Sequence, residues 1–406
     1  MTGAYIKGLS RPALARVFEV NGSPLRELEP QELLAVRPSA IFVKADDFVE
    51  AQRQWRSPQN LDLVNYLRVH PVTLVLDSSC EGPAAGPELL GRVLTTLGAD
   101  RAAALSVVYV TQNEVAAEQA NRAGSLYGGR CSLSAVTFNY FARALVRQVA
   151  ACLKTPDQHL KYVSRLFPSP RRDRPKRYLS FNNRPAVHRL ILVGWLKREG
   201  HLNQGWVSLL GGAASQRENF AARSERDLTE RFAAFKDDYD IGRQLWSGGG
   251  LAIPLEQAGA ATSPELPLAP FEQSYFSIVT ESEMSTGGIR RFTEKSVKAL
   301  LCGHPMIVLG NAFTLRDLRS MGFKTFHDYW NEDYDAVASP AERLSMALQE
   351  IDRLLTMDAA SFRDMMIDLW PIVDHNIRNA QGMGLEVLTA RERRIVDLAL
   401  AGAPTL

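Results

Sequence analysis

The stretch "VTLVLDSSCEGP", residues 72–83, is an apolar strand core that ends in polar and turn-forming residues. Two similar runs flank it in the sequence, "AIFVKAD" at 40–46 and "LSVVYVTQN" at 105–113. Between the runs at 72–83 and 105–113, "PELLGRVLTTLGAD" (87–100) has the apolar spacing of a helix. Apolar strands that alternate with helices are typical of a parallel sheet covered by helices. This part of the chain therefore predicts an α/β fold.

The same alternation restarts after "FPSPRRDRPKRY" (167–178), which is rich in proline and basic residues and is the best linker candidate. From about residue 340 the pattern is helical only. A chain of 406 residues is long enough for more than one core. We therefore expect two parallel-sheet domains that face a cleft, at 1–170 and 171–355, and a helical tail at 356–406 that could cross back to the first domain.

Composition narrows the class of protein. The 47 basic and 45 acidic side chains leave a formal charge of +2, so the chain lacks the strong positive field of a general nucleic-acid binder. Its four cysteines are scattered without metal-ligand spacing, which indicates reduced thiols in a cytoplasmic protein. No apolar run has the length of a signal peptide core or of a transmembrane segment, so we expect a soluble protein with cytoplasmic localisation.

Charge is concentrated at one predicted helix start, in "RRFTEKSVKALLCGHPMIVLG" (290–310). Thr293 occupies the N-cap position, which places Glu294 and Lys295 in the first turn. A helix N-terminus attracts anions, so a lysine there disfavours the helix but strengthens a phosphate site. The alternative is a surface helix with a lysine of no function.

The neighbouring residues favour a ligand. The predicted strand "SYFSIVTE" (274–281) ends at Glu281, two glycines follow, and Arg290 and Arg291 add positive charge. One carboxylate with several cations suits a nucleotide diphosphate, because ribose hydroxyls pair with a carboxylate and phosphates pair with lysine or arginine.

These residues also carry a resemblance. "FSIVTE" (276–281), followed by "FTEK" (292–295) and "ALLCGHPMIVLG" (299–310), resembles the donor-binding signature of the α-1,3-fucosyltransferase family. "SFNNRPAVHRLILVGWL" (180–196) resembles that family's strand-to-helix segment, in which an Asn is followed six residues later by a phosphate-contacting Arg. "NAFTLRDLRSMGFKTFHDYWNEDYD" (311–335) is similar to the end of the donor domain in bacterial and phage glycosyltransferase-like proteins.

The resemblance implies a nucleotide-sugar glycosyltransferase of the GT-B type, which has two Rossmann-like domains: acceptor domain 1–170 and donor domain 171–355. If the matching positions have the family's roles, Glu294 would bind the ribose, Lys295 and Arg189 the phosphates, and Glu281 the sugar or its transition state. A GDP-sugar is the favoured donor, and no metal is required because cations would stabilise the departing nucleotide. The expected donor-binding residues are Asn183, Arg189, Arg290, Arg291, Thr293, Glu294 and Lys295. For Arg189, a solvated helix residue is the alternative.

A base that deprotonates the acceptor hydroxyl is expected at the cleft edge of the first sheet. Asp77 ends an apolar strand and Glu81 lies in the Gly/Pro loop that follows, where catalytic carboxylates are often displayed. A helix cap or turn role is the alternative for Asp77. The Asp-x-Asp motifs in "KDDYD" (236–240) and "NEDYD" (331–335) could hold a metal, but a solvated or capping role is favoured for both.

Three functions remain open from the sequence. The first is transfer of a sugar from a nucleotide sugar to a hydroxyl acceptor, as in the synthesis of bacterial surface glycans. The second is a phage-type transferase that acts on a modified DNA base, which the near-neutral charge disfavours and the basic segment at 167–178 favours. The third is a nucleotide-sugar-binding protein without catalysis. The sequence leaves the base, sugar, acceptor and stereochemistry open.

Overall fold

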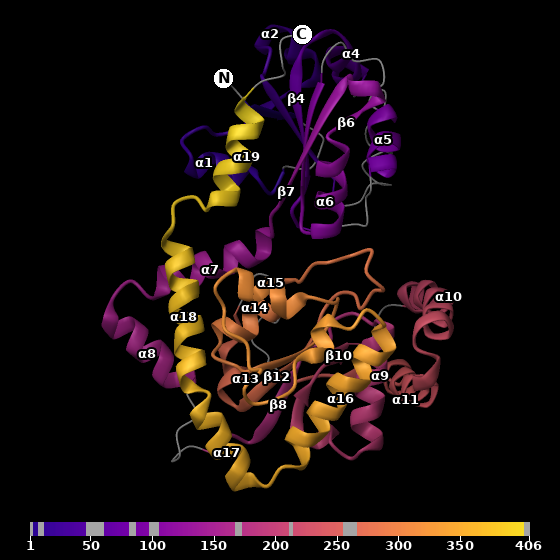
Figure 1. Ribbon diagram of the computed structural model, residues 1–406, viewed down its shortest axis with the longest axis vertical. Coiled ribbons are helices and arrows are strands. Elements are labelled where there is room, and N and C mark those ends of the chain that lie inside the picture. Colours follow the sequence, from indigo (N-terminus) through magenta and orange to yellow (C-terminus); the bar gives the residue numbers. More distant parts are fainter. Residues whose placement is uncertain are drawn as a thin grey trace. The chain divides into compact units, whose positions relative to one another are not determined.

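The chain forms two compact units (Figure 1). The computed structural model describes residues 3–6, 12–45, 61–80, 87–96, 105–166, 173–210, 214–254 and 266–401. Unit 1 comprises Met1–Tyr140, Gly288–Arg291 and Glu386–Leu406, and unit 2 comprises Phe141–Gly287 and Phe292–Leu385. Each unit is therefore assembled from segments that are far apart in the sequence.

Unit 1 contains a seven-stranded sheet in the order β2-β1-β3-β4-β5-β7-β6. All of its neighbouring strands pair in parallel except β6, which is antiparallel to β7. In sequence order the strands are β1 (Gly3–Ile6), β2 (Arg26–Leu28), β3 (Ala40–Lys44), β4 (Val72–Ser78), β5 (Leu105–Thr111), β6 (Ser125–Leu126) and β7 (Cys131–Thr137). The helices are α1 (Ala15–Val20), α2 (Leu33–Val36), α4 (Leu61–Val69), α5 (Pro87–Thr96), α6 (Glu114–Ala123) and α19 (Ala390–Leu400).

The central strands of unit 1 are buried on both faces, which explains their nearly continuous apolar sequences. Leu74 and Leu76 of β4 lie in one apolar cluster with residues of α4, α5 and α6. Val75 lies in a second cluster with residues of α1 and of α19, including Ile395. The last described helix of the chain therefore covers one face of the sheet that the first residues form.

Unit 2 contains a four-stranded parallel sheet in the order β13-β12-β8-β9. Its strands are β8 (Lys176–Ser180), β9 (Gly205–Val207), β12 (Ser274–Thr280) and β13 (Met306–Leu309), and β10 (Leu209–Leu210) pairs with β11 (Gly250–Leu251) as a separate antiparallel ribbon. Its helices are α7 (Tyr140–Cys152), α8 (Pro156–Leu166), α9 (Val187–Arg198), α10 (Ala214–Arg231), α11 (Lys236–Ser247), α13 (Leu268–Glu272), α14 (Glu294–Leu301), α15 (Thr314–Ser320), α16 (Pro340–Thr356), α17 (Ala359–Asp368) and α18 (Trp370–Leu385). The carboxyl ends of β8 and β12 lie at one edge of this sheet, where ligands of α/β folds usually bind.

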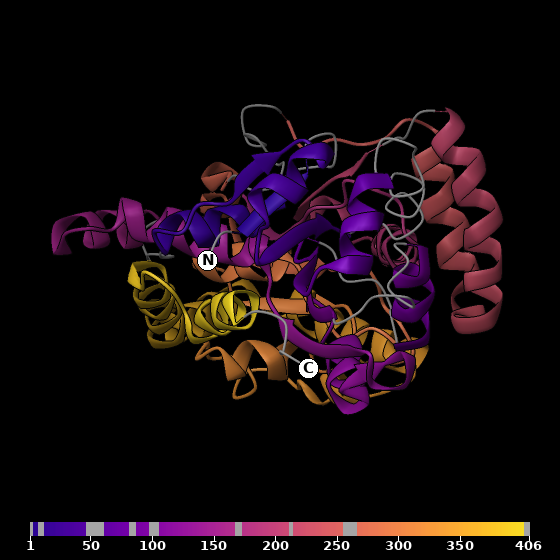
Figure 2. The ribbon, with the colours of Figure 1, turned by 90° about the horizontal axis from the view of Figure 1, so that it is seen from above.

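Helices α9 and α11 approach each other closely because each has a glycine at the contact. A Cβ atom on Gly194 would lie 1.8 Å from the carbonyl oxygen of Asp238, and one on Gly242 would lie 2.0 Å from that of Leu190. Figures 1 and 2 show α10 beside α11, and the Tyr239 hydroxyl donates to Ser224 Oγ across that pair at 2.8 Å. Helix α9 is consequently buried along most of its length.

The expected α/β class with mostly parallel sheets is confirmed. The units divide at Tyr140 rather than at 170, because apolar residues of α7 and α8 belong to the core of unit 2. The expected tail at 356–406 is likewise shared, with α17 and α18 in unit 2 and α19 in unit 1. No helix among the described residues combines the length and apolarity that crossing a membrane requires.

Candidate functional site

The charged helix start lies beside the carboxyl end of β12. Thr293 is the N-cap of α14, with an extended backbone, and its hydroxyl accepts from the backbone N–H of Lys295 at 3.4 Å. Glu294 and Lys295 occupy the first turn, as the sequence predicts. Their position follows from an N-cap residue that precedes a helix whose apolar side packs on β12 and β13.

The carboxylate of Glu281 holds this helix start in place. One oxygen accepts from the backbone N–H of Thr293 at 3.0 Å and also from its hydroxyl, and the other accepts from Ser296 Oγ at 2.6 Å. Glu281 is 1 % exposed. All three of these hydrogen bonds go to α14 or its cap, so the carboxylate positions the helix that carries Glu294 and Lys295.

The ammonium group of Lys295 is surrounded by oxygens of the helix start. Its Nζ lies 3.0 Å from Thr293 Oγ1, 3.4 Å from Ser282 Oγ and 3.4 Å from Glu294 Oε1. The Glu294 contact is the ion pair of this lysine, and both side chains are partly exposed. A partly exposed lysine at the positive end of a helix dipole is a suitable group for binding an anion.

A cleft of about 70 Å³ lies against these residues. Asn183, Glu294 and Lys295 line it together with Lys298, and Phe181 and Phe271 contribute an aromatic wall. Asn183 follows β8 and the two charged residues begin α14, so the fold brings together residues more than a hundred positions apart. The volume is well below the roughly 300–1,000 Å³ of ligand pockets, so one chemical group of a nucleotide fits inside rather than the whole molecule.

Arg189 lies beside the site but is turned toward the backbone. Its guanidinium donates to the carbonyl oxygens of Arg184 at 2.8 Å, Glu281 at 2.8 Å and Thr280 at 3.2 Å. Burial lowers the pKa of Arg189, and the nearby Glu281 carboxylate opposes that shift. Its Nε has no hydrogen-bond partner among the described residues. Arg189 therefore places a buried positive charge at the end of β12.

His188, next to Arg189, supports the same strand end. Its Nε2 lies 3.0 Å from the carbonyl oxygen of Glu281, and it is 3 % exposed. Burial, with the neighbouring guanidinium of Arg189, lowers the pKa of His188 to about 3. The imidazole is therefore neutral near pH 7 and contributes no charge to a phosphate site.

The two arginines that precede α14 belong to unit 1, whereas the cleft lies in unit 2. Arg290 belongs to unit 1, where its backbone N–H donates to Asn113 Oδ1 at 3.1 Å and its carbonyl accepts from the N–H of Glu114 at 2.9 Å. Its guanidinium pairs with Glu118 at 2.8 Å. Arg291 is also in unit 1 and is 7 % exposed. Unit 2 thus groups Asn183, Thr293, Glu294 and Lys295, whereas Arg290 and Arg291 belong to unit 1.

Of the two candidate bases, Asp77 lies in β4 and Glu81 lies outside the described residues. The Asp77 carboxylate accepts from the backbone N–H of Leu14 at 2.9 Å, and from Ser79 N–H at 3.1 Å and Oγ at 2.6 Å. It is 1 % exposed, and burial raises its pKa against these hydrogen bonds. Its bonds hold the turn after β4 against the start of α1.

Asp335 and Asp238 of the two Asp-x-Asp motifs make structural contacts. Asp335 accepts from the backbone N–H groups of Leu315 at 2.9 Å and Arg316 at 3.0 Å, which satisfies the first turn of α15. Asp238 pairs with Arg198 at 3.1 Å. Among the described residues, no group of three or more His, Cys, Asp or Glu is placed to hold a metal ion.

Two contributors to the site were missed from the sequence, Ser296 and Lys298. Both follow Thr293 on α14, Ser296 bonded to Glu281 and Lys298 lining the cleft. The three-residue spacing between Thr293 and Ser296 puts both hydroxyls on one side of the helix, so the sequence could have predicted the role of Ser296.

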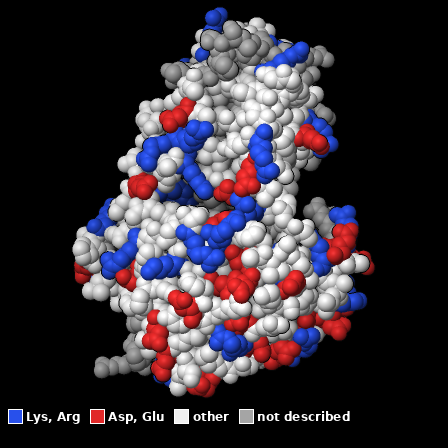
Figure 3. Space-filling model, viewed as in Figure 1, with Lys and Arg blue, Asp and Glu red and all other residues white. Residues whose placement is uncertain are grey.

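On the face seen in Figure 3, basic and acidic side chains are interspersed over unit 2.

Comparisons with known proteins assign the chain to no family. No protein-family model matches the chain, and no curated protein matches it.

Proposed function

We propose that this protein is a glycosyltransferase that moves a sugar from a nucleotide sugar to a hydroxyl acceptor. The observation that carries the proposal is the cleft that Asn183, Glu294 and Lys295 line together, beside the carboxyl ends of β8 and β12. In this proposal unit 2 is the donor domain and unit 1 the acceptor domain of a GT-B enzyme. The resemblance to the α-1,3-fucosyltransferase family lies in these same segments.

The donor would be bound by its diphosphate and its ribose. Lys295 donates hydrogen bonds to phosphate oxygens, and the N-terminus of α14 adds its dipole. Glu294 accepts from the ribose hydroxyls, a role that a carboxylate in the same turn can fill. The buried Arg189 and the partly exposed Lys295 supply positive charge where the nucleotide departs, so we propose that the reaction needs no metal.

Glu281 acts in this proposal through α14 rather than on the sugar. Its carboxylate is occupied by Thr293 and Ser296, so it fixes the direction in which Lys295 and Glu294 point. Asp77 is likewise occupied by Leu14 and Ser79. We therefore assign the acceptor-activating base to Glu81.

Thermal unfolding with a nucleotide panel tests the proposal. GDP, UDP, CMP and dTDP and their sugars would be added to the full chain, with GDP and GDP-sugars expected to act most strongly. A ligand at a hundred times its Kd stabilises by about 2.7 kcal/mol, which raises the Tm by several degrees. Lys295→Ala should remove most of that rise, whereas the exposed Lys324→Ala in the same unit should keep it.

Two further assays separate the alternatives. Release of free sugar from the stabilising donor, lost in Glu81→Gln, would show an enzyme rather than a binding protein. A DNA gel shift at physiological salt would detect the DNA-modifying alternative. If no nucleotide or nucleotide sugar raises the Tm, the glycosyltransferase proposal is wrong.

A further inference from the structure

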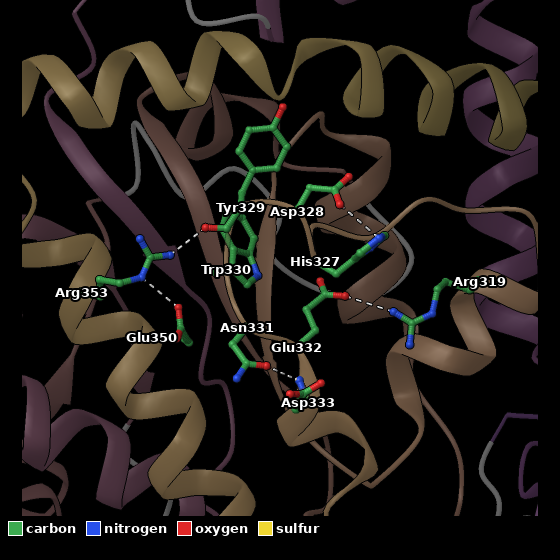
Figure 4. A pocket seen from close by; sticks show the side chains of 10 residues that line it. All are labelled: Arg319, His327, Asp328, Tyr329, Trp330, Asn331, Glu332, Asp333, Glu350 and Arg353. Carbon is green, nitrogen blue, oxygen red and sulfur yellow. Dashed lines mark hydrogen bonds and ion pairs between the residues drawn. The ribbon is translucent and has the colours of Figure 1, made fainter.

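A second, larger hollow lies in unit 2, formed by α15, the segment 327–333 and α16 (Figure 4). Its volume is about 880 Å³, within the range of pockets that hold small molecules. It shares no lining residue with the cleft at Lys295. The hollow is therefore separate from the proposed donor site.

The charges around this hollow disfavour a phosphate ligand. Four carboxylates and two guanidiniums line it, and each guanidinium is paired: Arg319 with Glu332 at 3.0 Å, and Arg353 with Glu350 at 3.0 Å. Asp328 lies 3.3 Å from the imidazole of His327, which is charged only when protonated, so the carboxylates outnumber the guanidiniums by two. The net negative charge would repel an anion, whereas it would not repel a neutral ligand.

Trp330 provides an unused hydrogen-bond donor at the same place. The residue is 3 % exposed, lines the hollow, and its indole Nε1 has no hydrogen-bond partner among the described residues. Its ring packs on Phe326, with centroids 5.2 Å apart. In Figure 4 the indole nitrogen lies on the side of the ring that faces Glu332. A buried donor without a partner costs stability, so an acceptor from a ligand would be favourable here.

The polar lining contains both donors and acceptors. Trp330, the guanidiniums and the Asn331 amide donate, while the carboxylates of Asp328 and Asp333 accept. A sugar hydroxyl both donates and accepts, and a neutral sugar carries several of them at fixed spacing. The partly buried ring of Tyr329, whose hydroxyl is held by the carbonyl of Asp368 at 2.8 Å, adds an apolar surface.

We propose that this hollow binds a neutral oligosaccharide. Trp330 Nε1 and Arg353 donate to its hydroxyls, and Asp333 and Asp328 accept from them. The inference goes beyond the proposed function, because it names a second carbohydrate site and holds whether or not the chain transfers a sugar. Such a site would keep a glycan chain attached to unit 2 independently of the nucleotide.

Titration of the full chain with neutral linear trisaccharides of glucose, galactose and mannose, followed by ligand-observed NMR, tests this inference. At least one trisaccharide should bind at millimolar concentration. Trp330→Phe, which keeps a ring beside Phe326, and Asp333→Ala should each weaken binding about fivefold or more. The exposed Arg243→Ala on α11 should bind as wild type does.

The Tm of each variant reports whether it is folded, so loss of binding with an unchanged Tm supports the inference. Absence of binding by every trisaccharide at millimolar concentration overturns it. So does equal binding by wild type, Trp330→Phe and Asp333→Ala. Tighter binding of a lysine tripeptide than of any trisaccharide would show that the excess negative charge serves a cationic partner, and would also overturn it.

Discussion

Glu281 and Thr293 are joined twice, because one carboxylate oxygen accepts from both the backbone N–H and the hydroxyl of the threonine. Twelve residues separate them in sequence. The pair fixes the end of β12 to the first turn of α14, and Ser296 adds a third bond to the other carboxylate oxygen. The direction of Lys295 therefore depends on a carboxylate that does not itself line the cleft.

Replacing the carboxylate should release the helix start. In Glu281→Gln one carboxylate oxygen is replaced by an NH2 group, which cannot accept the hydrogen bonds that Thr293 or Ser296 now donates. We expect a loss of about 1–3 kcal/mol in the free energy of unfolding, measured in urea. Thr293→Ser keeps both donors and should lose much less. Equal stability of Glu281→Gln and wild type would contradict the positioning role.

The contact between α9 and α11 should tolerate no side chain at its glycines. Gly194→Ala would place a methyl group within 1.8 Å of the Asp238 carbonyl oxygen, so we expect destabilisation of about 2 kcal/mol or more. Gly382→Ala, in α18 with nothing within 4 Å of the new Cβ, should instead stabilise by about 0.5–1 kcal/mol. Denaturant unfolding of both variants checks the pair, and a stable Gly194→Ala would show that the helices can separate at little cost.

Acid should destabilise the protein through buried His304. Its Nδ1 lies 2.9 Å from Ser277 Oγ and its Nε2 lies 2.7 Å from the carbonyl oxygen of Phe271. Burial lowers the pKa of His304 from 6.5 to about 3, so between these values the unfolded chain binds a proton that the folded chain does not. Stability therefore falls as pH falls below 6.5, by up to roughly 1.4 kcal/mol per pH unit for this group.

The variant His304→Gln isolates that contribution. It has no imidazole to titrate, so the loss of unfolding free energy from about pH 7 to about pH 5 should be smaller than in wild type. His188, whose pKa is also lowered to about 3 by burial, remains in both proteins and cancels in the comparison. Parallel pH profiles for the two proteins would contradict the buried, neutral state of His304.

The second Asp-x-Asp motif should behave as a helix cap. Asp335→Ala removes the acceptor of two backbone N–H groups at the start of α15 and should cost about 0.5–2 kcal/mol. Asp333→Ala, at an exposed position, should change the unfolding free energy by less than about 0.5 kcal/mol. Thermal unfolding with and without Mn²⁺ completes the test: stabilisation by the ion that either substitution removes would indicate a metal site instead.

The sequence was sufficient for the local structure of the site. The apolar run that ends at Glu281 and the capping residue Thr293 act over a few residues, and both elements form where they were expected. The direction of the Arg189 guanidinium could not be read in this way, because it depends on carbonyl groups brought near by the fold of β12. Arg290 shows the same limit, since its partner Glu118 lies 172 residues away.

The boundary between the compact units depends on the fold in a similar way: the sequence predicts a division at 170, whereas the units divide at Tyr140. Proline and charge mark the segment at 167–178, but the apolar faces of α7 and α8 decide which core they join. Leu145 and Val149 of α7 and Leu166 of α8 are buried with the residues of unit 2. The core that a helix joins depends on its three-dimensional neighbours, which composition does not show.

The dependence of unit 1 on α19 has a consequence during protein synthesis. Val75 of β4 lies in one apolar cluster with Ile395 and Val396 of α19, which the ribosome adds more than three hundred residues later. Throughout that interval the strands and α1 have been made, but α19 is missing from the same apolar face. A nascent or truncated chain that ends before Ala390 would therefore expose the part of that face that α19 covers, which favours aggregation.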